Sequence, residues 1–559
     1  MTRLIWVSAD FLLCVARYAQ EVHTRVSHPT TRRAAILLSL SLCLLATVGC
    51  TRAAQAPLVA PSAATAVSSP KAGSITQTTT RPAQTTGRVD WPVFDHDAQR
   101  SGVNSAETAI TADSAGRLRR AWTQALPEKS GGSPILLSSV PMPGGGTRDL
   151  LYLTTSHGTT LALDAATGDV VWNQTTSGPT VSNQSCQICA TPAADPSRRW
   201  VYAAGNDAAV HRYDAASGDE DRTPPWPVTI TLMNGYEKRS SALNVANGML
   251  YVALSGYFGD FGPYVGHVLA IRLDDGSVHI FNVLCSDQGQ LLASRSIVPS
   301  ATASCDKREA GVWARSGVVV DQSGGPTDGT VYFASGNGPF DADRGGPDYG
   351  DSVMHTSGDA SRLIDSYTPS NYQQLDEGDV DLGSTAPALL PTQPQSATPY
   401  LAVQGGKDSV LRLLDRSKLG GVGSELQQIS LAAGRVMAAP AAWADPQSNA
   451  AWVFVAADQT LIGLRVETDA SGSTSLSSQW RISGSYTSPI VAGGLLVVAG
   501  SDGVFARDPH NGNALWSSAQ QSAGGGIGPV HWQGPVVANG CLYIADENAM
   551  VSAYCLPNQ

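Results

Sequence analysis

Charged residues are scarce in this 559-residue chain and make up 15% of it. Lys and Arg together number 36, against 47 Asp and Glu, so the formal net charge is −11. A chain that is short of basic residues does not present the positive surface that nucleic-acid binding requires. We therefore expect no nucleic-acid partner.

Several catalytic and ligand-binding signatures are missing from the sequence. It has no His pair at zinc-binding spacing, no Gly-rich phosphate loop that opens a helix, and no Gly-x-Ser-x-Gly turn. Its CxxC stretch, CQIC, lacks the following His of a haem attachment motif. No amphipathic helix of useful length stands out either. These absences argue against zinc enzymes, phosphate-loop enzymes, α/β-hydrolases and helical folds.

An apolar run at residues 34–49, AAILLSLSLCLLATVG, follows Arg32 and Arg33. It is too short and too rich in Ser for a membrane span, and it predicts a signal peptide over residues 1–49. Export to the periplasm or the cell exterior follows from this prediction. Residues 1–25 fit no part of the signal, and we expect them to be an extension upstream of the true start.

The signal run ends in TVGC, which resembles a bacterial lipobox with Thr47 where Leu is more usual. We therefore expect Cys50 to be lipidated and to anchor the protein, with contact to a membrane only through this lipid. An ordinary cleaved signal with an incidental Cys50 is the alternative. Residues 50–88 are rich in Ala, Thr, Ser and Pro and have no aromatic residue, which predicts a disordered tether.

Six of the nine cysteines lie beyond Cys50. An even number in an oxidising compartment favours disulfides. Sequence neighbours are the simplest pairing, which gives Cys186–Cys189, Cys285–Cys305 and Cys541–Cys555. A redox or metal role for the CxxC pair is the alternative to a structural clip.

From residue 89 to 559 the chain repeats short β-type runs bounded by Gly, Asp and Asn. The eight clearest runs cover residues 149–172, 198–219, 248–281, 329–338, 399–418, 451–467, 493–516 and 540–555. Eight such units predict an all-β fold, an eight-bladed β-propeller of four-stranded blades. The last unit lacks a final strand, so we expect Arg117–Leu126 to pair with it and close the ring.

One pattern occurs twice, as LALDAATGDVVW at 161–172 and FARDPHNGNALW at 505–516. Asp can accept turn N–H groups, and Gly supplies the positive φ that the reversal needs. Trp172 and Trp516 suit a wedge between adjacent blades, because an indole is large and flat with one N–H to satisfy. We interpret the pattern as a packing device. It resembles the repeat of quinoprotein propellers, which are named after pyrroloquinoline quinone (PQQ).

Four segments resemble the cofactor-binding parts of PQQ alcohol dehydrogenases. YFASGNGPFD resembles the strand end whose Asn binds calcium, which corresponds to Asn337. DEGDVDLG resembles the loop with the catalytic aspartate; Asp379 is the closest match and Asp381 a rival. GGKDSVLRLLDR places Lys407 where a cation contacts the quinone, and GVWARSGVVVD places Trp313 as the flat floor of the cofactor.

These residue types suit the chemistry that the resemblance implies. Ca²⁺ polarises a quinone carbonyl, a carboxylate takes the alcohol proton, a cation stabilises the reduced quinone, and an aromatic face stacks on the planar cofactor. Each residue also has a structural interpretation. Asn337 fits a turn, Asp379 a solvated loop, Lys407 a surface ion pair and Trp313 a wedge between blades.

The sequence departs from the family at three points. The adjacent-cysteine disulfide of the family is missing, and Trp313 is two residues farther from the following Asp than is usual. The calcium-binding Glu has no firm match, and Asp260 is only the nearest acid.

The resemblance implies a PQQ- and Ca²⁺-dependent dehydrogenase of an alcohol or sugar with an external electron acceptor. The alternatives are a non-catalytic propeller that binds envelope proteins, as the similar outer-membrane assembly lipoproteins do, and a glycan-binding or adhesion module.

Overall fold

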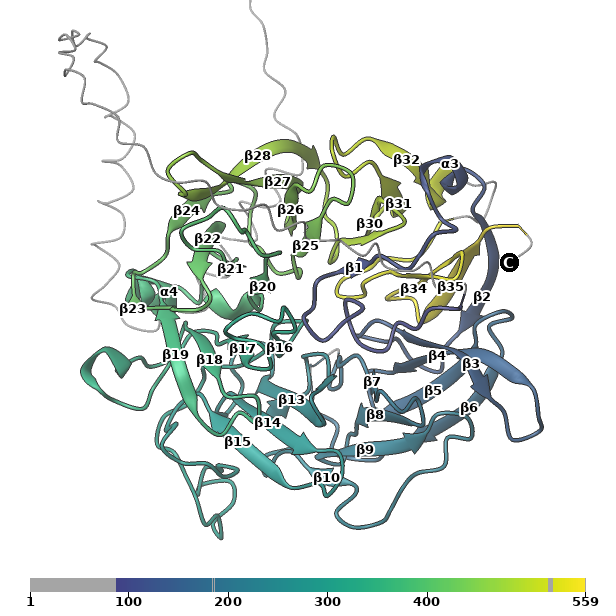
Figure 1. Cartoon of the computed structure of the whole chain (residues 1–559). Helices are drawn as coiled ribbons and strands as arrows, with labels where there is room; N and C mark the ends of the chain where they lie inside the picture. Colours follow the sequence, from purple (N-terminus) through teal and green to yellow (C-terminus); the bar gives the residue numbers. More distant parts are fainter. Residues whose placement is uncertain (1–86, 183, 185, 521–525, 558–559) are drawn as a thin grey trace, which may run out of the picture. The chain divides into compact units, whose positions relative to one another are not determined.

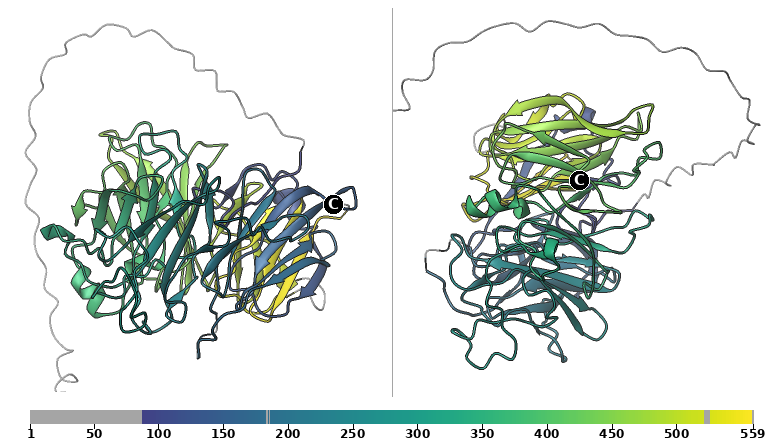
Figure 2. Two further views of the ribbon diagram at one scale, coloured as in Figure 1. Left: turned by 90° about the horizontal axis from the view of Figure 1, so that it is seen from below. Right: turned by 90° about the vertical axis from the view of Figure 1, so that its left-hand side faces the viewer.

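Eight sheets arranged in a ring make up the described part of the chain (Figure 1). The computed structural model describes residues 87–182, 184, 186–520 and 526–557. The predicted signal peptide, Cys50 and all but the last residues of the predicted tether lie outside them. The ring confirms the predicted eight-bladed β-propeller, and Figure 2 shows the same sheets from two further sides.

The first four sheets in chain order are given from the innermost strand outward. They are β3 (Ile135–Pro141), β4 (Thr147–Thr154), β5 (Thr159–Asp164) and β6 (Val170–Thr175); β7 (Ala193–Ala194), β8 (Trp200–Ala204), β9 (Ala209–Asp214) and β10 (Val228–Thr229); β12 (Asn244–Ala246), β13 (Met249–Gly256), β14 (His267–Arg272) and β15 (Val278–Asn282), with β11 (Glu237–Lys238) also paired to β13; and β16 (Val319–Val320), β17 (Val331–Ala334), β18 (Val353–Thr356) and β19 (Leu363–Thr368), with β23 (Gly421–Val422) parallel to β19.

The other four sheets follow the same plan. They are β20 (Ala388–Leu389), β21 (Leu401–Gln404), β22 (Val410–Asp415) and β24 (Gln427–Ser430); β25 (Ala441–Ala444), β26 (Ala451–Ala457), β27 (Thr460–Thr468) and β28 (Thr474–Ser483); β29 (Ile490–Ala492), β30 (Leu495–Gly500), β31 (Gly503–Arg507) and β32 (Ala514–Ser517), with β1 (Val103–Asn104) parallel to β29; and β33 (Val536–Ala538), β34 (Cys541–Ala545), β35 (Met550–Cys555) and β2 (Arg119–Ala125).

Helices in the described residues are few and short. They are α3 (Ala112–Ala115), α4 (Tyr372–Glu377) and the 3₁₀ turns η1 (Ala342–Arg344), η2 (Leu382–Ser384) and η3 (Ser518–Gln520). No helix in this part of the chain has the length and apolar character needed to cross a membrane.

The eighth sheet takes its outer strand from the N-terminal side of the chain. Strand β2 pairs antiparallel with β35, from Arg119 opposite Cys555 to Ala125 opposite Met550. This is the strand that the sequence placed beside the last unit. The pairing gives that sheet its fourth strand and covers the edge that β35 would otherwise expose.

Tryptophans of the outer strands join four of the eight blades to the next. The indole N–H groups of three of them donate to backbone oxygens in the Asp-to-Gly turn of the following sheet: Trp122 to Ala165 at 3.0 Å, Trp172 to Ala215 at 3.0 Å and Trp480 to Pro509 at 2.9 Å. Trp516 is 5% exposed and lies 5.4 Å from the ring of Tyr554 on the next sheet. The interpretation of the repeat as a packing device is confirmed.

The turn glycine of the repeat is also the surface on which the indole rests. Gly168 and Gly218 have φ of +81° and +76°, in the left-handed region that the turn requires. A Cβ at Gly218 would lie 2.6 Å from the ring of Trp172, and one at Gly168 would lie 2.6 Å from the ring of Trp122. Each glycine therefore serves its own turn and the tryptophan of the preceding blade.

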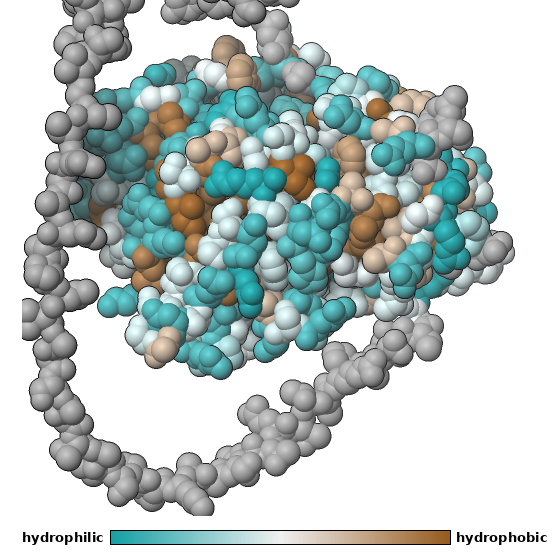
Figure 3. All heavy atoms as spheres, turned by 90° about the horizontal axis from the view of Figure 1, so that it is seen from above, coloured by the Kyte–Doolittle hydropathy of each residue, from teal (hydrophilic) through white to brown (hydrophobic). Residues whose placement is uncertain are grey.

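The hydrophobic core is divided among the gaps between neighbouring sheets. Leu413 of β22, for example, belongs to one buried cluster with Val453 of β26, and Phe333 of β17 belongs to another with Tyr251 of β13. The side drawn in Figure 3 is mainly hydrophilic, with hydrophobic side chains scattered among the polar ones.

Residues 91–104 cross the central channel and bond to the innermost strands; we call them the central segment (Figure 1). Its main-chain and side-chain groups make hydrogen bonds to seven of the eight sheets in the described residues: Trp91 with Leu136, Pro92 with Ala194, Ala98 with Asn244 and Val320, Ser101 with Ala442, Gly102 with Val491, and Asn104 with Val537. The sequence predicted that ordered structure begins near Asp90 but gave no hint of this position.

Arg100 is the centre of the central segment. It is 2% exposed, and its guanidinium donates to the carbonyl oxygens of Phe94 at 2.6 Å, Leu243 at 2.8 Å and Ser316 at 3.1 Å. One side chain thus ties the segment to the chain just before the third sheet and just before the fourth.

The three predicted disulfides are present. Cys541 and Cys555 lie opposite each other on β34 and β35, with Cα atoms 4.1 Å apart. Cys285–Cys305 closes the insertion after β15, with Cα atoms 6.1 Å apart, and Cys186–Cys189 closes a loop before β7.

Candidate functional site

The order of strands in each blade brings the predicted site residues to one face. Loops that precede an innermost strand and loops that join the second and third strands open on the same side of an antiparallel blade. Trp313 and Asp379 precede β16 and β20, whereas Asp260, Asn337 and Lys407 follow β13, β17 and β21. All five therefore lie at the same end of the channel, on three consecutive blades.

Lys407 is the centre of a cluster of charges. Its Nζ forms an ion pair with Asp381 and lies 3.0 Å from Asp379 Oδ1, and its backbone N–H donates to Asp381 O at 2.9 Å. Burial alone would lower the pKa of Lys407, but the Asp381 and Asp379 carboxylates outweigh it and raise that pKa above its ordinary value. Lys407 therefore remains a cation at neutral pH.

The two carboxylates beside Lys407 differ in exposure. The Asp381 side chain is 5% exposed, and it also accepts a hydrogen bond from the Asn337 backbone N–H at 2.9 Å. The Asp379 side chain is 67% exposed. Asp381 is therefore held in place by its contacts with Lys407 and Asn337, whereas the carboxylate of Asp379 is accessible to a molecule in the channel mouth.

Trp313 lies beside this ion pair. The Nζ of Lys407 is 5.5 Å from the Trp313 ring centroid. Trp313 and Trp532 pack edge to face, with ring centroids 6.3 Å apart and an angle of 80° between the ring planes. A Cβ at Gly336 would lie 2.1 Å from Asp381 Oδ1 and 3.1 Å from Trp313 Nε1, so only glycine allows this close approach. Half-buried at the channel mouth, Trp313 does not occupy the wedge position of Trp172.

Asn337 contributes a side chain without a partner. The residue is 8% exposed, and its backbone is fixed by the bond to Asp381. Among the described residues no hydrogen bond to the Asn337 side-chain amide is present. An amide oxygen in this position is available to a cation.

Asp260 is near the cluster but not in contact with it. Tyr264 donates its hydroxyl to Asp260 Oδ1 at 2.6 Å. Burial raises the pKa of Asp260, the Tyr264 bond opposes this, and the Asp381 and Asp379 charges raise it further. Asp260 is thus within electrostatic range of the Lys407 cluster.

Asp351 is a further acid of this region that the sequence did not single out. Its Oδ1 accepts the Leu382 N–H at 2.9 Å, while its Oδ2 is buried without a hydrogen-bond partner in the described residues. Burial holds the pKa of Asp351 well above its usual range, and Asp381 adds to this shift. An orphaned buried carboxylate oxygen marks a place where a cation would be stabilised.

The donor types of the cluster fit calcium and a planar anionic cofactor. Carboxylate and amide oxygens are the ligands that Ca²⁺ prefers, and Asp379, Asp381 and Asn337 supply them. The described residues include no group of three or more His, Cys, Asp or Glu side chains placed as a finished metal site, and in this cluster Lys407 pairs with both carboxylates. The Lys407 ammonium lies over the ring of Trp313, so a positive charge and an aromatic surface are close together, as a flat, negatively charged ligand requires.

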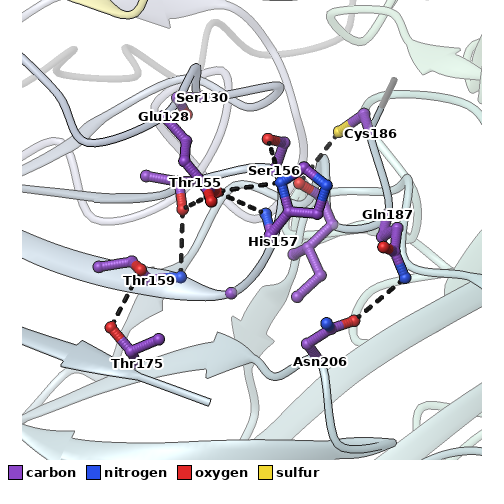
Figure 4. A network of polar contacts seen from close by, with 12 residues as sticks. Glu128, Ser130, Thr155, Ser156, His157, Thr159, Thr175, Cys186, Gln187 and Asn206 are labelled. Carbon is purple, nitrogen blue, oxygen red and sulfur yellow. Dashed lines mark hydrogen bonds and ion pairs between the residues drawn. The ribbon is translucent and has the colours of Figure 1, made fainter. Parts of the chain in front are cut away.

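A second polar network lies on the first blade at the same face (Figure 4). His157 Nδ1 is 3.1 Å from both Ser156 Oγ and Glu128 Oε2. A Ser-His-acid triad needs its serine and its acid on opposite ring nitrogens, and here both contact the same one. The network therefore orders the loop after β4 and does not activate Ser156 as a nucleophile.

A scan against protein-family models matches residues 65–280 and 119–356 to the PQQ-repeat model described as outer membrane protein assembly factor BamB. A search of curated proteins gives no match.

Solved structures share the fold at low identity. A europium-containing methanol dehydrogenase is 13% identical and aligns over 84% of this chain and 98% of its own, with a TM-score of 0.58. Quinohemoprotein alcohol dehydrogenases from Pseudomonas putida HK5 and Comamonas testosteroni are both 14% identical with TM-scores of 0.55; they cover 84% of this chain and 80% and 81% of their own.

Proposed function

This chain belongs to the PQQ-repeat β-propeller family, and on that premise we propose that it is a PQQ- and Ca²⁺-dependent dehydrogenase that oxidises an alcohol or a sugar. The observation that supports the proposal is the meeting of Lys407, Asp379, Trp313 and Asn337 at one end of the channel. Up to 94 residues separate them in the chain, and the family resemblance of their segments predicts all four from sequence.

The proposed roles follow from the exposure of each group. Asp379, with an oxygen open to the channel mouth, takes the proton of the substrate hydroxyl. Lys407 orients Asp379 and places a positive charge where negative charge develops on the cofactor. Trp313 supports the flat ring, and Asn337, Asp379 and Asp260 supply oxygen ligands to the metal. When bound, PQQ with Ca²⁺ accepts the hydride.

Asp381 adds a carboxylate to this proposed ligand set. It raises the negative charge around the metal position, although Lys407 compensates part of it. The similar methanol dehydrogenase contains europium. Eu³⁺ is therefore a suitable probe beside Ca²⁺, because its luminescence reports binding without any turnover.

The electrons leave by way of an external acceptor in this proposal. The sequence contains no CxxCH motif for covalent haem attachment, and the proposal therefore assigns the electrons to a separate acceptor. Export and lipidation at Cys50 would put the propeller outside the cytoplasmic membrane, where small alcohols and sugars reach it.

A scaffold that binds envelope proteins is the second candidate. The matched family model is described as an outer-membrane assembly factor, and the Lys407–Asp381 ion pair is already satisfied without any ligand. A glycan-binding or adhesion role is a variant of this candidate. Both predict a protein that takes up neither PQQ nor metal.

The deciding experiment is reconstitution with PQQ and Ca²⁺, followed by absorption spectroscopy and a dye-linked assay on a panel of alcohols and sugars. Asp379→Asn should keep the fold and the absorption of bound cofactor but lower turnover by about 10²-fold or more, because the proton acceptor is lost. Glu377→Gln, which changes an exposed acid at the end of α4 two residues before Asp379, is the matched control and should keep full turnover.

Two results would refute the dehydrogenase. One is the absence of PQQ uptake together with the absence of Eu³⁺ luminescence, which favours the scaffold. The other is turnover by Asp379→Asn equal to that of the parent protein, which removes Asp379 from the role of base.

A further inference from the structure

A pocket of about 270 Å³ opens beside the Lys407 cluster on the same face. It lies among the loops before β25 and β29 and the end of β26, and it is completed by Arg315, His531 and Trp532. None of the residues proposed to hold PQQ lines it. Trp532 is the link between the two sites, since its edge contacts Trp313.

Arg315 brings an uncompensated positive charge to this pocket. The residue is 6% exposed, and its Nη1 donates to the carbonyl oxygens of Cys189 at 3.0 Å and Ser240 at 2.9 Å. Its guanidinium carbon lies 4.3 Å from the Trp532 ring centroid. No carboxylate of the described residues forms an ion pair with Arg315, and its other nitrogens make no hydrogen bond there.

The surrounding charges do not neutralise Arg315. Burial lowers the pKa of Arg315 to about 9, and Glu547 is the acid that opposes this shift. Glu547 is already engaged by Lys129 at 2.6 Å. Burial, together with the charges of Arg315 and Lys129, also lowers the pKa of Lys238 to about 7. A buried cation without a charged partner is costly, so an anion bound at the mouth of the pocket would stabilise Arg315.

Thr487 presents a buried hydroxyl to the same pocket. It is 4% exposed, and its Oγ1 has no hydrogen-bond partner in the described residues. Buried hydroxyl groups are normally satisfied, and an unsatisfied one costs about 1–3 kcal/mol. A ligand oxygen in the pocket would satisfy it.

The rest of the lining decides the kind of anion. Met437, Ala438 and Ala456 contribute apolar surface, and Trp532 contributes an aromatic one. The second arginine of the lining, Arg435, is paired with Asp458 at 2.8 Å. A single free guanidinium in a partly apolar pocket suits one carboxylate attached to a compact apolar body better than a small inorganic ion.

We propose that this pocket binds a small organic carboxylate, with Arg315 holding the carboxylate, Thr487 donating a hydrogen bond, and the apolar lining covering the body of the ligand. The site does not depend on the proposed dehydrogenase activity. It would serve a scaffold equally well.

Binding of sodium benzoate by the purified full-length protein, followed by calorimetry and thermal shift, tests the proposal. Benzamide has the same shape without the charge, and inorganic phosphate has charge without an apolar body. We expect benzoate to bind and to raise the melting temperature, and both comparison compounds to bind at least tenfold more weakly. Arg315→Gln should lower the benzoate affinity at least tenfold.

Thr487→Val keeps the proposal testable if Arg315→Gln fails to fold. It should weaken benzoate several-fold while leaving the unliganded protein as stable or more stable, because an unsatisfied hydroxyl is removed. Arg465→Gln, far from the pocket on β27, is the control and should bind as the parent does. Equal binding of phosphate, equal binding of benzamide, or unchanged affinity in Thr487→Val and Arg315→Gln would each overturn the proposal.

Discussion

At the scale of single residues, the glycine that ends a repeat turn, such as Gly168 or Gly218, both allows the turn and contacts a tryptophan of the preceding blade. Gly218 needs a positive φ for its own turn, and it also supplies the flat surface that receives Trp172 from the preceding blade. The second role is visible only across the gap between sheets. A motif that looks local in the sequence is thus a contact between neighbours.

Gly218→Ala and Gly248→Ala separate these two roles. Both glycines have a φ of +76°, but a Cβ at Gly248 would meet nothing within 4 Å. Alanine at Gly248 should lower the free energy of unfolding by about 1–2 kcal/mol through backbone strain alone. Alanine at Gly218 should cost about 1–3 kcal/mol more, because Trp172 must move.

Urea unfolding followed by tryptophan fluorescence measures the difference between the two variants. Equal midpoints would show that the indole does not rest on Gly218 in the way that the contact distances indicate.

Single residues also show how much of the candidate site can be predicted from the sequence. Lys407, Asp379, Trp313 and Asn337 were selected because their segments resemble a family pattern, and the fold brings them together. Their roles remain proposals. The pattern ranks Asp379 above Asp381 as the family match, but it cannot show that Asp381 is buried and Asp379 exposed, because burial depends on neighbouring blades.

Arg315 and Thr487 were missed for a different reason. The bonds of Arg315 go to backbone carbonyl oxygens, and any residue type can supply those. The one available signal was a lone arginine within the apolar stretch GVWARSGVVV, two residues after Trp313. Nothing in the sequence points to Thr487, because no sequence pattern shows that a buried hydroxyl lacks a hydrogen-bond partner.

At the scale of elements, the blades could be predicted and the central segment could not. Each blade repeats apolar runs and turn residues at similar spacing, so the count of eight and the place of β2 follow from the pattern. Residues 91–104 contain no repeat. They bond to strands as distant as β33, and such long-range pairings have no local signature.

Arg100→Gln tests how much the hydrogen bonds of Arg100 in the central segment contribute to the stability of the fold. It removes charge-assisted bonds to three carbonyl oxygens and leaves these acceptors buried, so the free energy of unfolding should fall by about 2–5 kcal/mol. Arg465→Gln, whose side chain is 47% exposed, should change it by less than about 0.5 kcal/mol.

Chemical unfolding with urea measures the change in the free energy of unfolding for both variants. A loss of stability in Arg100→Gln no larger than in Arg465→Gln would mean that the central segment is held by its backbone bonds alone.

At the scale of the whole molecule, the proposed lipid anchor determines where the propeller works. Cys50→Ser should move the protein from the membrane fraction to the soluble exported fraction, because the acceptor of the lipid is removed. Cys43→Ser, inside the same apolar run, should leave the distribution unchanged.

Fractionation with immunoblotting checks this prediction. A soluble parent protein, or a membrane-bound Cys50→Ser variant, would contradict lipidation and leave an ordinary cleaved signal as the interpretation.

The position of the central segment also constrains the order of events during synthesis. Asn104 leaves the ribosome 433 residues before its partner Val537, and the wait of β2 for β35 is similarly long. Until the last blade has been made, this stretch has no complete set of partners, and contacts between such distant residues form slowly. The ring therefore closes late, in one step that needs both ends of the propeller, and a chain cut short before β33 is left open and recognisable as unfinished to the proteases that clear incomplete products.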